Sequence, residues 1–445
     1  MYPRELTKRV LRKVDWILIP LVAGTYMLHF VDKMALSYAA VFDLFPSTGI
    51  TQVQYAWFGS IFYFAYMAAE YPLVWLAQKT RMAKVIAGCV LGWGAVMMLT
   101  VACDSFVGMA ACRFFLGVFE APTTTCFMMM VAMCVGMMLA GVLNLAIGRI
   151  TIIPVWKAVF LVNGGMTIVW GLLLLIFLPD DVISAKRFTL EEKALLIARG
   201  RLARTGILNK TVRLYQVKEA FKDPQVWLLA VLMFLNEVVN GGLSNFGKLI
   251  LKDVTKDPFR TVALGIPAGV FGISWILSGT WLASKLPNFR THVMALYNIP
   301  TIIGISLLWK LDRTKHEIGL LFAYYIVTGY IVTLFLGMQM PATNLGGYTK
   351  RTTGSVIVFM SYCIGNILGP HAFRGEEAPL YPTGCKVIIA CCIGQIILAY
   401  ALRLLLTRRN KERDRQATEI GLSEEIVDTL KDRTDFENPH FRYVL

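Results

Sequence analysis

Apolar residues occur along the chain in long blocks rather than in alternation with polar residues. A helix of about 20 residues crosses about 30 Å of hydrocarbon, and blocks of that length recur almost throughout the sequence. They lie at 16–38, 54–77, 84–103, 107–130, 132–150, 158–178, 225–247, 261–284, 291–309, 317–339, 354–372 and 384–406. A membrane β-barrel would show strands of about ten residues with strict alternation, which runs such as 171–178 lack. The pattern predicts an all-α integral membrane protein.

The longest polar interruption, residues 179–224, divides the blocks into two sets of six. We therefore predict an N-terminal bundle over 1–178, a cytoplasmic loop over 179–224, a C-terminal bundle over 225–406 and a cytoplasmic tail over 407–445. Cationic turns follow the second helix of each half, and such parallel repetition is typical of carriers built from two bundles. Within the loop, residues 190–202 have the apolar spacing of an amphipathic helix on a membrane surface, although a plain tether fits them equally well.

The composition supports a membrane protein. The chain is 56% hydrophobic and 16% charged, whereas soluble domains carry charge on about a quarter of their residues. Most of the 44 Lys and Arg fall in segments on the side of both termini, which predicts cytoplasmic termini and explains the net charge of +15 without nucleic-acid binding. The nine cysteines form no CxxC pair, so neither a disulfide framework nor a metal site is indicated.

The few ionisable residues inside the first apolar blocks are the candidates for function, because each costs about 2.5–3.5 kcal/mol to insert near the bilayer centre. His29 shares a helix face with Asp32 and with Lys33, and Arg113 stacks about two turns from Glu120. A carboxylate in a low-dielectric cavity can load and release a proton, and an arginine can hold a substrate carboxylate through two hydrogen bonds. Structural ion pairs, and a packed imidazole for His29, are the alternative.

Polar residues in the second half offer further candidate substrate contacts. Asn236 and Asn240 lie four residues apart in one apolar block, and Tyr362 and Asn366 repeat that spacing in another. A Gly241-Gly242 pair follows Asn240, where unwound backbone could present carbonyl groups to a ligand. Hydrogen bonds between helices explain such amides equally well.

At these residues the chain resembles the fungal allantoate permease family, in the anion:cation symporter branch of the major facilitator superfamily. The likeness runs nearly end to end. It is carried by RFFLGVFEAP at 113–122, DPQVW at 223–227, NGGLSNFG at 240–247, LGIPAG at 264–269, GYTK at 347–350, YCIGNILGP at 362–370 and NPHFRY at 438–443.

The resemblance implies proton-driven uptake of small organic anions or nitrogenous compounds, such as allantoate, ureidosuccinate, short peptides or vitamin carboxylates, at the plasma membrane. It implies that Asp32 and Glu120 match protonatable positions, and that Lys33 and Arg113 match their cationic partners. The expected partners are a small-molecule substrate, protons and the lipid bilayer, with a monomeric chain and no nucleic acid. No cofactor, metal or enzymatic activity is expected, because no nucleophile–base pair or metal-spaced histidine set occurs in the sequence.

The sequence departs from the family between helices 4 and 5. Residues 106–153 barely hold two spans of about 20 residues, and by resemblance about twenty residues are missing around 134–136. We therefore expect helix 5 to be shortened to about its second half, residues 139–150. This defect leaves an alternative function, that of a non-transporting or inactive paralogue or nutrient sensor.

Overall fold

The computed structural model describes residues 4–126, 130–180, 188–202, 213–313, 315–420, 433–438 and 441–445. These residues form helices, turns and connecting segments, with no β-strand among them, which confirms the predicted all-α fold. The chain divides into two compact units. Unit 1 comprises residues 1–50 and 64–211, and unit 2 comprises residues 51–63 and 212–445.

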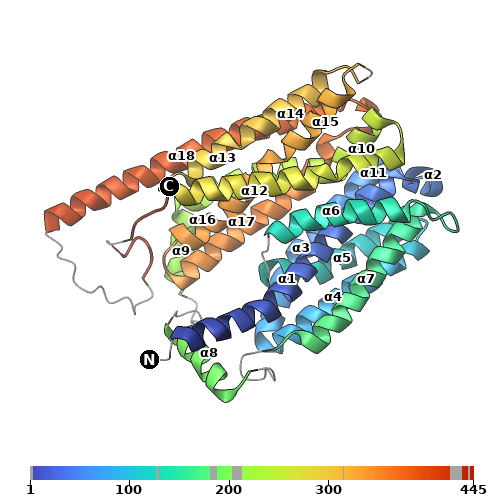
Figure 1. Cartoon of the computed structure of the whole chain (residues 1–445). Helices are drawn as coiled ribbons and strands as arrows, with labels where there is room; N and C mark the ends of the chain where they lie inside the picture. The colour runs from blue at the N-terminus through green and yellow to red at the C-terminus, as the bar shows by residue number, and fades with distance from the viewer. Residues whose placement is uncertain are drawn as a thin grey trace. The chain divides into compact units, whose positions relative to one another are not determined.

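The first half of the chain supplies the helices of unit 1, although the beginning of α3 groups with unit 2 (Figure 1). They are α1 (Arg4–Val41), α2 (Leu44–Thr48), α3 (Gln52–Lys79), α4 (Met82–Leu99), η1 (Thr100–Ala102), α5 (Phe106–Cys126), α6 (Met130–Ile147), α7 (Val155–Phe177) and α8 (Leu190–Leu202). Within the unit, α4 packs along α7 and α5, while α1 packs against α6 and α7.

The second half of the chain supplies the remaining helices, all in unit 2. They are α9 (Leu214–Lys222), α10 (Pro224–Thr255), α11 (Pro258–Gly265), α12 (Pro267–Lys285), α13 (Arg290–Leu296), α14 (Asn298–Lys310), α15 (Glu317–Ile326), η2 (Val327–Tyr330), α16 (Ile331–Asn344), α17 (Tyr348–Leu368), η3 (Gly369–Ala372), η4 (Gly375–Glu377) and α18 (Pro382–Ile420). The long helices α17 and α18 both pack along α10, which makes α10 the central helix of the unit.

Each of the twelve apolar blocks coincides with a helix or with consecutive helical segments. Nine helical segments of the described chain are long and apolar enough to cross a membrane. The last helix continues fourteen residues past the predicted end of its block at residue 406, to Ile420. The reason is that residues 407–420 contain no proline or glycine, so a polar sequence extends the helix that an apolar block begins.

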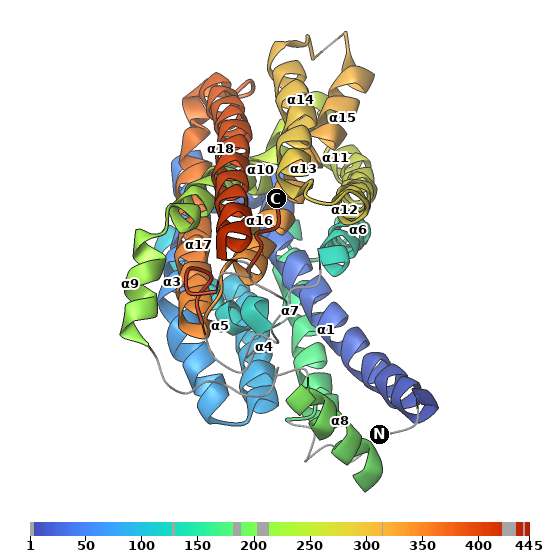
Figure 2. The same ribbon diagram turned by 90° about the vertical axis from the view of Figure 1, so that its left-hand side faces the viewer.

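The predicted amphipathic helix over 190–202 is present as α8. A capping box begins it, because Thr189 and Glu192 each accept a hydrogen bond from the other's backbone N–H. Glu192 also pairs with Lys13 of α1 at 2.8 Å, and this hydrogen bond lowers the pKa of the Glu192 carboxyl. Figures 1 and 2 both show α8 beside the first turns of α1.

The helix α9 was not predicted, although it lies in the polar loop over 179–224. Its apolar residues Leu214, Val217 and Phe221 recur at helical spacing among charged residues, so the signal was present but short. The helix ends at Lys222, and the side chain of the next residue, Asp223, caps α10 by accepting a hydrogen bond from Gln225 N–H.

The predicted shortening between helices 4 and 5 takes a different form from the one expected. Residues 127–129 lie outside the described part of the chain, and α6 then runs from Met130 to Ile147, 18 residues against 21 in α5 and 23 in α7. The helix therefore starts about nine residues earlier than predicted and ends three residues earlier. Its apolar sequence contains no proline, and single glycines are tolerated within a helix, which explains the helical start.

Two helix pairs meet at glycines that leave no room for a side chain. A Cβ atom at Gly136 of α6 would lie 2.6 Å from the Met27 carbonyl oxygen of α1. In unit 2, a Cβ atom at Gly365 of α17 would lie 2.5 Å from the Phe234 carbonyl oxygen and 2.7 Å from Glu237 Cβ of α10. Backbone approach of this kind is how small residues hold helices together in lipid.

We expect Gly136→Ala to destabilise the chain by about 1–3 kcal/mol, because α1 or α6 must shift to admit the methyl group. The measurement is the thermal unfolding of the purified protein. Gly165→Ala in α7 is the matched control, since nothing lies within 4 Å of its added Cβ. Equal unfolding temperatures for the two variants would contradict close packing of the shortened helix α6.

Candidate functional site

A buried carboxylate, Asp32, lies on α1 in the interior of unit 1. Its side chain is fully buried, and its Oδ2 accepts hydrogen bonds from Trp93 Nε1 of α4 and Thr167 Oγ1 of α7, both at 2.6 Å. Two donors from two neighbouring helices fix the orientation of this carboxyl group. Asp32 thus joins α1 to α4 and α7. These contacts between helices cannot be predicted from the residues next to Asp32 in the sequence.

One turn earlier on α1, His29 faces a second buried carboxylate. His29 Nε2 lies 3.0 Å from Glu120 Oε2 of α5, a separation for an ion pair when the imidazole is protonated. The Glu120 side chain is fully buried. The imidazole ring also meets the edge of the Trp93 indole, with centroids 5.9 Å apart. Trp93 therefore contacts both His29 and Asp32, so the two predicted residues on one helix face belong to one site.

The two predicted cations of unit 1 lie in different surroundings. Arg113 is buried on α5, with its guanidinium 5.4 Å from the ring centroid of Phe160 of α7, which is a cation–π contact. Lys33 lies on α1 next to Asp32 and is half-buried. Both remain candidates for substrate recognition. Asp32 itself accepts its two hydrogen bonds from the neutral groups of Trp93 and Thr167.

Unit 2 brings together Asn240 and Asn366 around a third buried carboxylate, Glu237. Glu237 Oε2 accepts from Asn240 Nδ2 at 2.9 Å and from Asn366 Nδ2 at 2.7 Å. Asn240 Nδ2 also donates to Asn366 Oδ1 at 3.0 Å. Tyr330 OH and Ser244 Oγ donate to Asn240 Oδ1, at 3.1 and 3.2 Å. The result is a network of side-chain amides, hydroxyls and one carboxylate at the crossing of α10 and α17.

The other predicted residues of unit 2 lie beside this network. Asn236 Nδ2 donates to Gln395 Oε1 of α18 at 2.9 Å and to the Tyr330 carbonyl at 3.2 Å, which is the interhelical role that was the alternative for such amides. Tyr362 lies one turn before Asn366, accepts a hydrogen bond from Asn366 Nδ2 at its carbonyl, and stacks its ring on Phe359. Tyr362 is thus adjacent to the network, whereas Asn236 ties α10 to α18.

Glu237 is one of the polar residues of the same apolar block, but the predicted site residues do not include it. The signal was available, because Glu237 is an acidic residue within an apolar block and lies three residues before Asn240 on the same helix face. Its neighbours on α17 are 129 positions away in the sequence, and only the packing of α10 on α17 shows that an amide faces the carboxylate.

The two groups differ in the chemistry that they can perform. The group in unit 1 contains an imidazole, two carboxylates and a guanidinium, which can exchange protons and bind an anion. The group in unit 2 offers amide and hydroxyl groups that can both donate and accept hydrogen bonds. Among the described residues, no cluster of three His, Cys, Asp or Glu side chains could hold a metal ion.

Comparisons with known proteins agree with this membrane architecture. A family model described as Major Facilitator Superfamily matches residues 127–370. The uncharacterized transporter C757.13 of Schizosaccharomyces pombe is 30% identical over 99% of this chain and 88% of its own length. The allantoate permease of Saccharomyces cerevisiae is 28% identical over 99% of this chain and 87% of its own length.

Solved structures show the same fold at much lower sequence identity. The crystal structure of the nucleoside transporter NupG superimposes with a TM-score of 0.61 at 13% identity, covering 86% of this chain and 97% of that protein. The full-length relatives and the fold together place the chain among membrane transporters rather than enzymes. The chain belongs to the Major Facilitator Superfamily and, within it, to the fungal allantoate permease-like transporters.

Proposed function

We propose that this transporter is a proton-coupled symporter of a small organic anion or nitrogenous nutrient, with both termini cytoplasmic and the plasma membrane as its location. The observation that carries the proposal is the buried pair of His29 and Glu120, one turn from the buried carboxylate of Asp32. A transporter that needed no proton would have little reason to retain two carboxylates and an imidazole inside lipid, where each ionisable group is costly.

Proton coupling would work through the exchange of partners within unit 1. When Glu120 is ionised, a protonated His29 holds it as an ion pair. A proton that reaches Glu120 neutralises the carboxylate, removes the attraction and frees the imidazole to turn. Asp32 keeps its two donors during this exchange and holds α1 against α4 and α7. Protonation of Glu120 would thereby weaken the contact between α1 and α5.

The substrate anion would be held by Arg113. Its guanidinium is buried against Phe160 and can offer two parallel hydrogen bonds to a carboxylate. The network around Glu237 in unit 2 offers amide and hydroxyl groups of the kind that would bind a nitrogenous compound. Allantoate, ureidosuccinate, dipeptides and vitamin carboxylates combine these two features, and one full-length relative is an allantoate permease.

We expect Glu120→Gln to abolish the stimulation of uptake by external acid, because the amide cannot carry the coupling proton. Uptake of labelled candidates into cells that express the chain, measured from pH 4.5 to 7.5, is the assay. This is about the pH range in which carboxyl and imidazole groups usually titrate. Glu376→Gln, an exposed carboxylate in the segment before α18, is the matched control and should keep the wild-type profile.

An unchanged pH profile in Glu120→Gln would overturn the role of Glu120.

The alternative of a non-transporting paralogue, motivated by the 18-residue α6, predicts a different result for the wild type. In that case a candidate would raise the unfolding temperature of the purified chain, since ligands stabilise the state that binds them, yet no uptake would be observed at any pH.

We expect Arg113→Lys to raise the KM for a carboxylate substrate by about tenfold or more, because lysine keeps the charge but loses the planar pair of donors. The amide analogue of the same substrate should be transported equally poorly by both proteins. If Arg113→Lys still preferred the acid over the amide as strongly as the wild type does, Arg113 would have no role in anion recognition.

We expect Asn366→Asp to destabilise the chain at neutral pH, because it replaces the 2.7 Å donor to Glu237 by a second carboxylate. The loss should be about 1–3 kcal/mol. It should shrink as pH falls, since a protonated carboxyl can again donate to its neighbour. The unfolding temperature as a function of pH is the measurement, and Gln54→Glu at the exposed start of α3 is the control. A pH-independent loss would argue against an ionised Glu237.

A further inference from the structure

The last described residues of the chain, 433–438 and 441–445, fold back onto one end of unit 2. We call them the return segment. Figure 2 shows the end of the chain beside α13 and α18. Thr434, Asp435 and Tyr443 are at most 2% exposed, so the segment is anchored by side chains that are buried in the unit. The sequence predicted only a basic cytoplasmic tail in this region.

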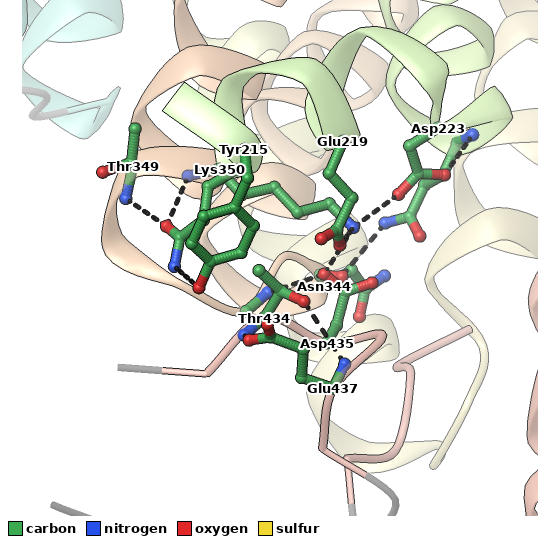
Figure 3. Close-up of polar contacts among 12 residues, drawn as sticks. Tyr215, Glu219, Asp223, Asn344, Thr349, Lys350, Thr434, Asp435 and Glu437 are labelled. Carbon is green, nitrogen blue, oxygen red and sulfur yellow. Dashed lines mark hydrogen bonds and ion pairs between the residues drawn. The ribbon is translucent and has the colours of Figure 1, made fainter. Parts of the chain in front are cut away.

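An ion cluster fixes the first part of the return segment. Lys350, at the start of α17, is fully buried and lies 2.7 Å from Asp435, 3.1 Å from Asp223 and 2.8 Å from Glu219 (Figure 3). Arg409 of α18 pairs with Asp223 at 2.8 Å. Five charged side chains from α9, the start of α10, α17, α18 and the return segment thus balance one another in one place. A buried charge needs such partners, because removal of one leaves another uncompensated.

The second part of the return segment is bound through its backbone. Asn410 of α18 donates to the Tyr443 carbonyl at 2.9 Å and accepts from Tyr443 N–H at 3.0 Å. Asn344 of α16 does the same for Val444, at 2.8 Å for both bonds. Arg290 N–H of α13 donates to the Leu445 carbonyl at 2.8 Å. Each asparagine therefore pairs with one residue as a neighbouring strand would, which is how peptide-binding domains hold extended peptides.

An anchoring side chain completes the contact. The Tyr443 hydroxyl donates to Asp435 Oδ2 at 2.7 Å, while the Arg413 guanidinium donates to the same hydroxyl at 3.1 Å. Burial and the neighbouring Asp435 carboxylate raise the pKa of Tyr443, so the phenol remains a donor at neutral pH. Gly346 allows this close approach because it has no side chain. A Cβ atom at that position would lie only 2.3 Å from Asp435 N.

We propose that this end of unit 2 is a specific peptide-binding site whose occupant is the chain's own return segment, and that binding of the segment holds together helices distant in sequence. The segment contacts α13, α16, the start of α17 and α18 directly. Through Lys350 it is also connected to α9 and to Asp223 at the start of α10. Release of the segment would leave Lys350 with one carboxylate fewer and would open the buried cluster to water. Binding or release of the segment would therefore change the packing of unit 2 without changing the residues of either candidate transport group.

The test begins with the folded full-length chain, into which a specific protease site is inserted between α18 and Thr434. After cleavage, the fragment should remain bound through size-exclusion chromatography and should exchange with a labelled synthetic peptide of residues 433–445. Removal of the fragment should lower the unfolding temperature by about 5 °C or more, and adding the peptide should restore it.

Variants of the peptide distinguish specific binding from simple tethering. Peptides with Asp435→Asn or Tyr443→Phe should bind about tenfold more weakly or worse, because each loses a buried bond to a charged group. Arg442→Gln is the matched control, since Arg442 pairs with Asp414 at the exposed surface and should contribute little. In the chain itself, Gly346→Ala should release the fragment on cleavage.

Loss of the fragment on cleavage without a change in unfolding temperature would overturn the proposal, as would equal affinity of the Tyr443→Phe and wild-type peptides. If Gly346→Ala fails to fold, Asp435→Asn in the cleavable chain gives the same comparison. These measurements require no transported substrate, so failure of the proposed symport would leave them unaffected.

Discussion

Every charge inside this helical bundle must find a partner within the protein, because lipid offers none and water is distant. That constraint accounts for the packing around three buried charged groups. Asp32 is held by an indole and a hydroxyl, Glu237 by two amides, and Lys350 by three carboxylates. In each case at least one partner comes from a segment far away in the sequence, so the groups that carry charge also determine which segments lie together.

The nature of the partner decides what each charge can do. A carboxylate that faces neutral donors, as Asp32 does, is held in place and has little reason to move. A carboxylate that faces a titratable imidazole, as Glu120 does, can change its interaction when a single proton arrives. Lys350 lies at the other extreme, since three carboxylates surround it and its charge is structural. Burial alone would not separate these roles, because the side chains of Asp32, Glu120 and Lys350 are all shielded from water.

Much of the fold could be predicted from the sequence, because the apolar blocks directly report the length of a helix in lipid. The pairing of His29 with Asp32 on one face also followed from helical spacing. What could not be predicted were contacts between helices, such as His29 with Glu120 or Glu237 with Asn366, since spacing within a helix says nothing about its neighbour. The return segment was missed for a related reason: its residues are polar, and burial of Asp435 depends on Lys350, 85 positions earlier.

The glycine contact between α10 and α17 has a consequence for how such a protein can change its specificity. Gly365 brings the two backbones together beside Glu237, so the distance between the helices is set by main-chain atoms rather than by side chains. Substitutions at Asn240 or Asn366 can then exchange one polar group for another without moving the frame that presents them. A crossing of this kind separates the residues that set the distance between two helices from the polar residues that the helices present.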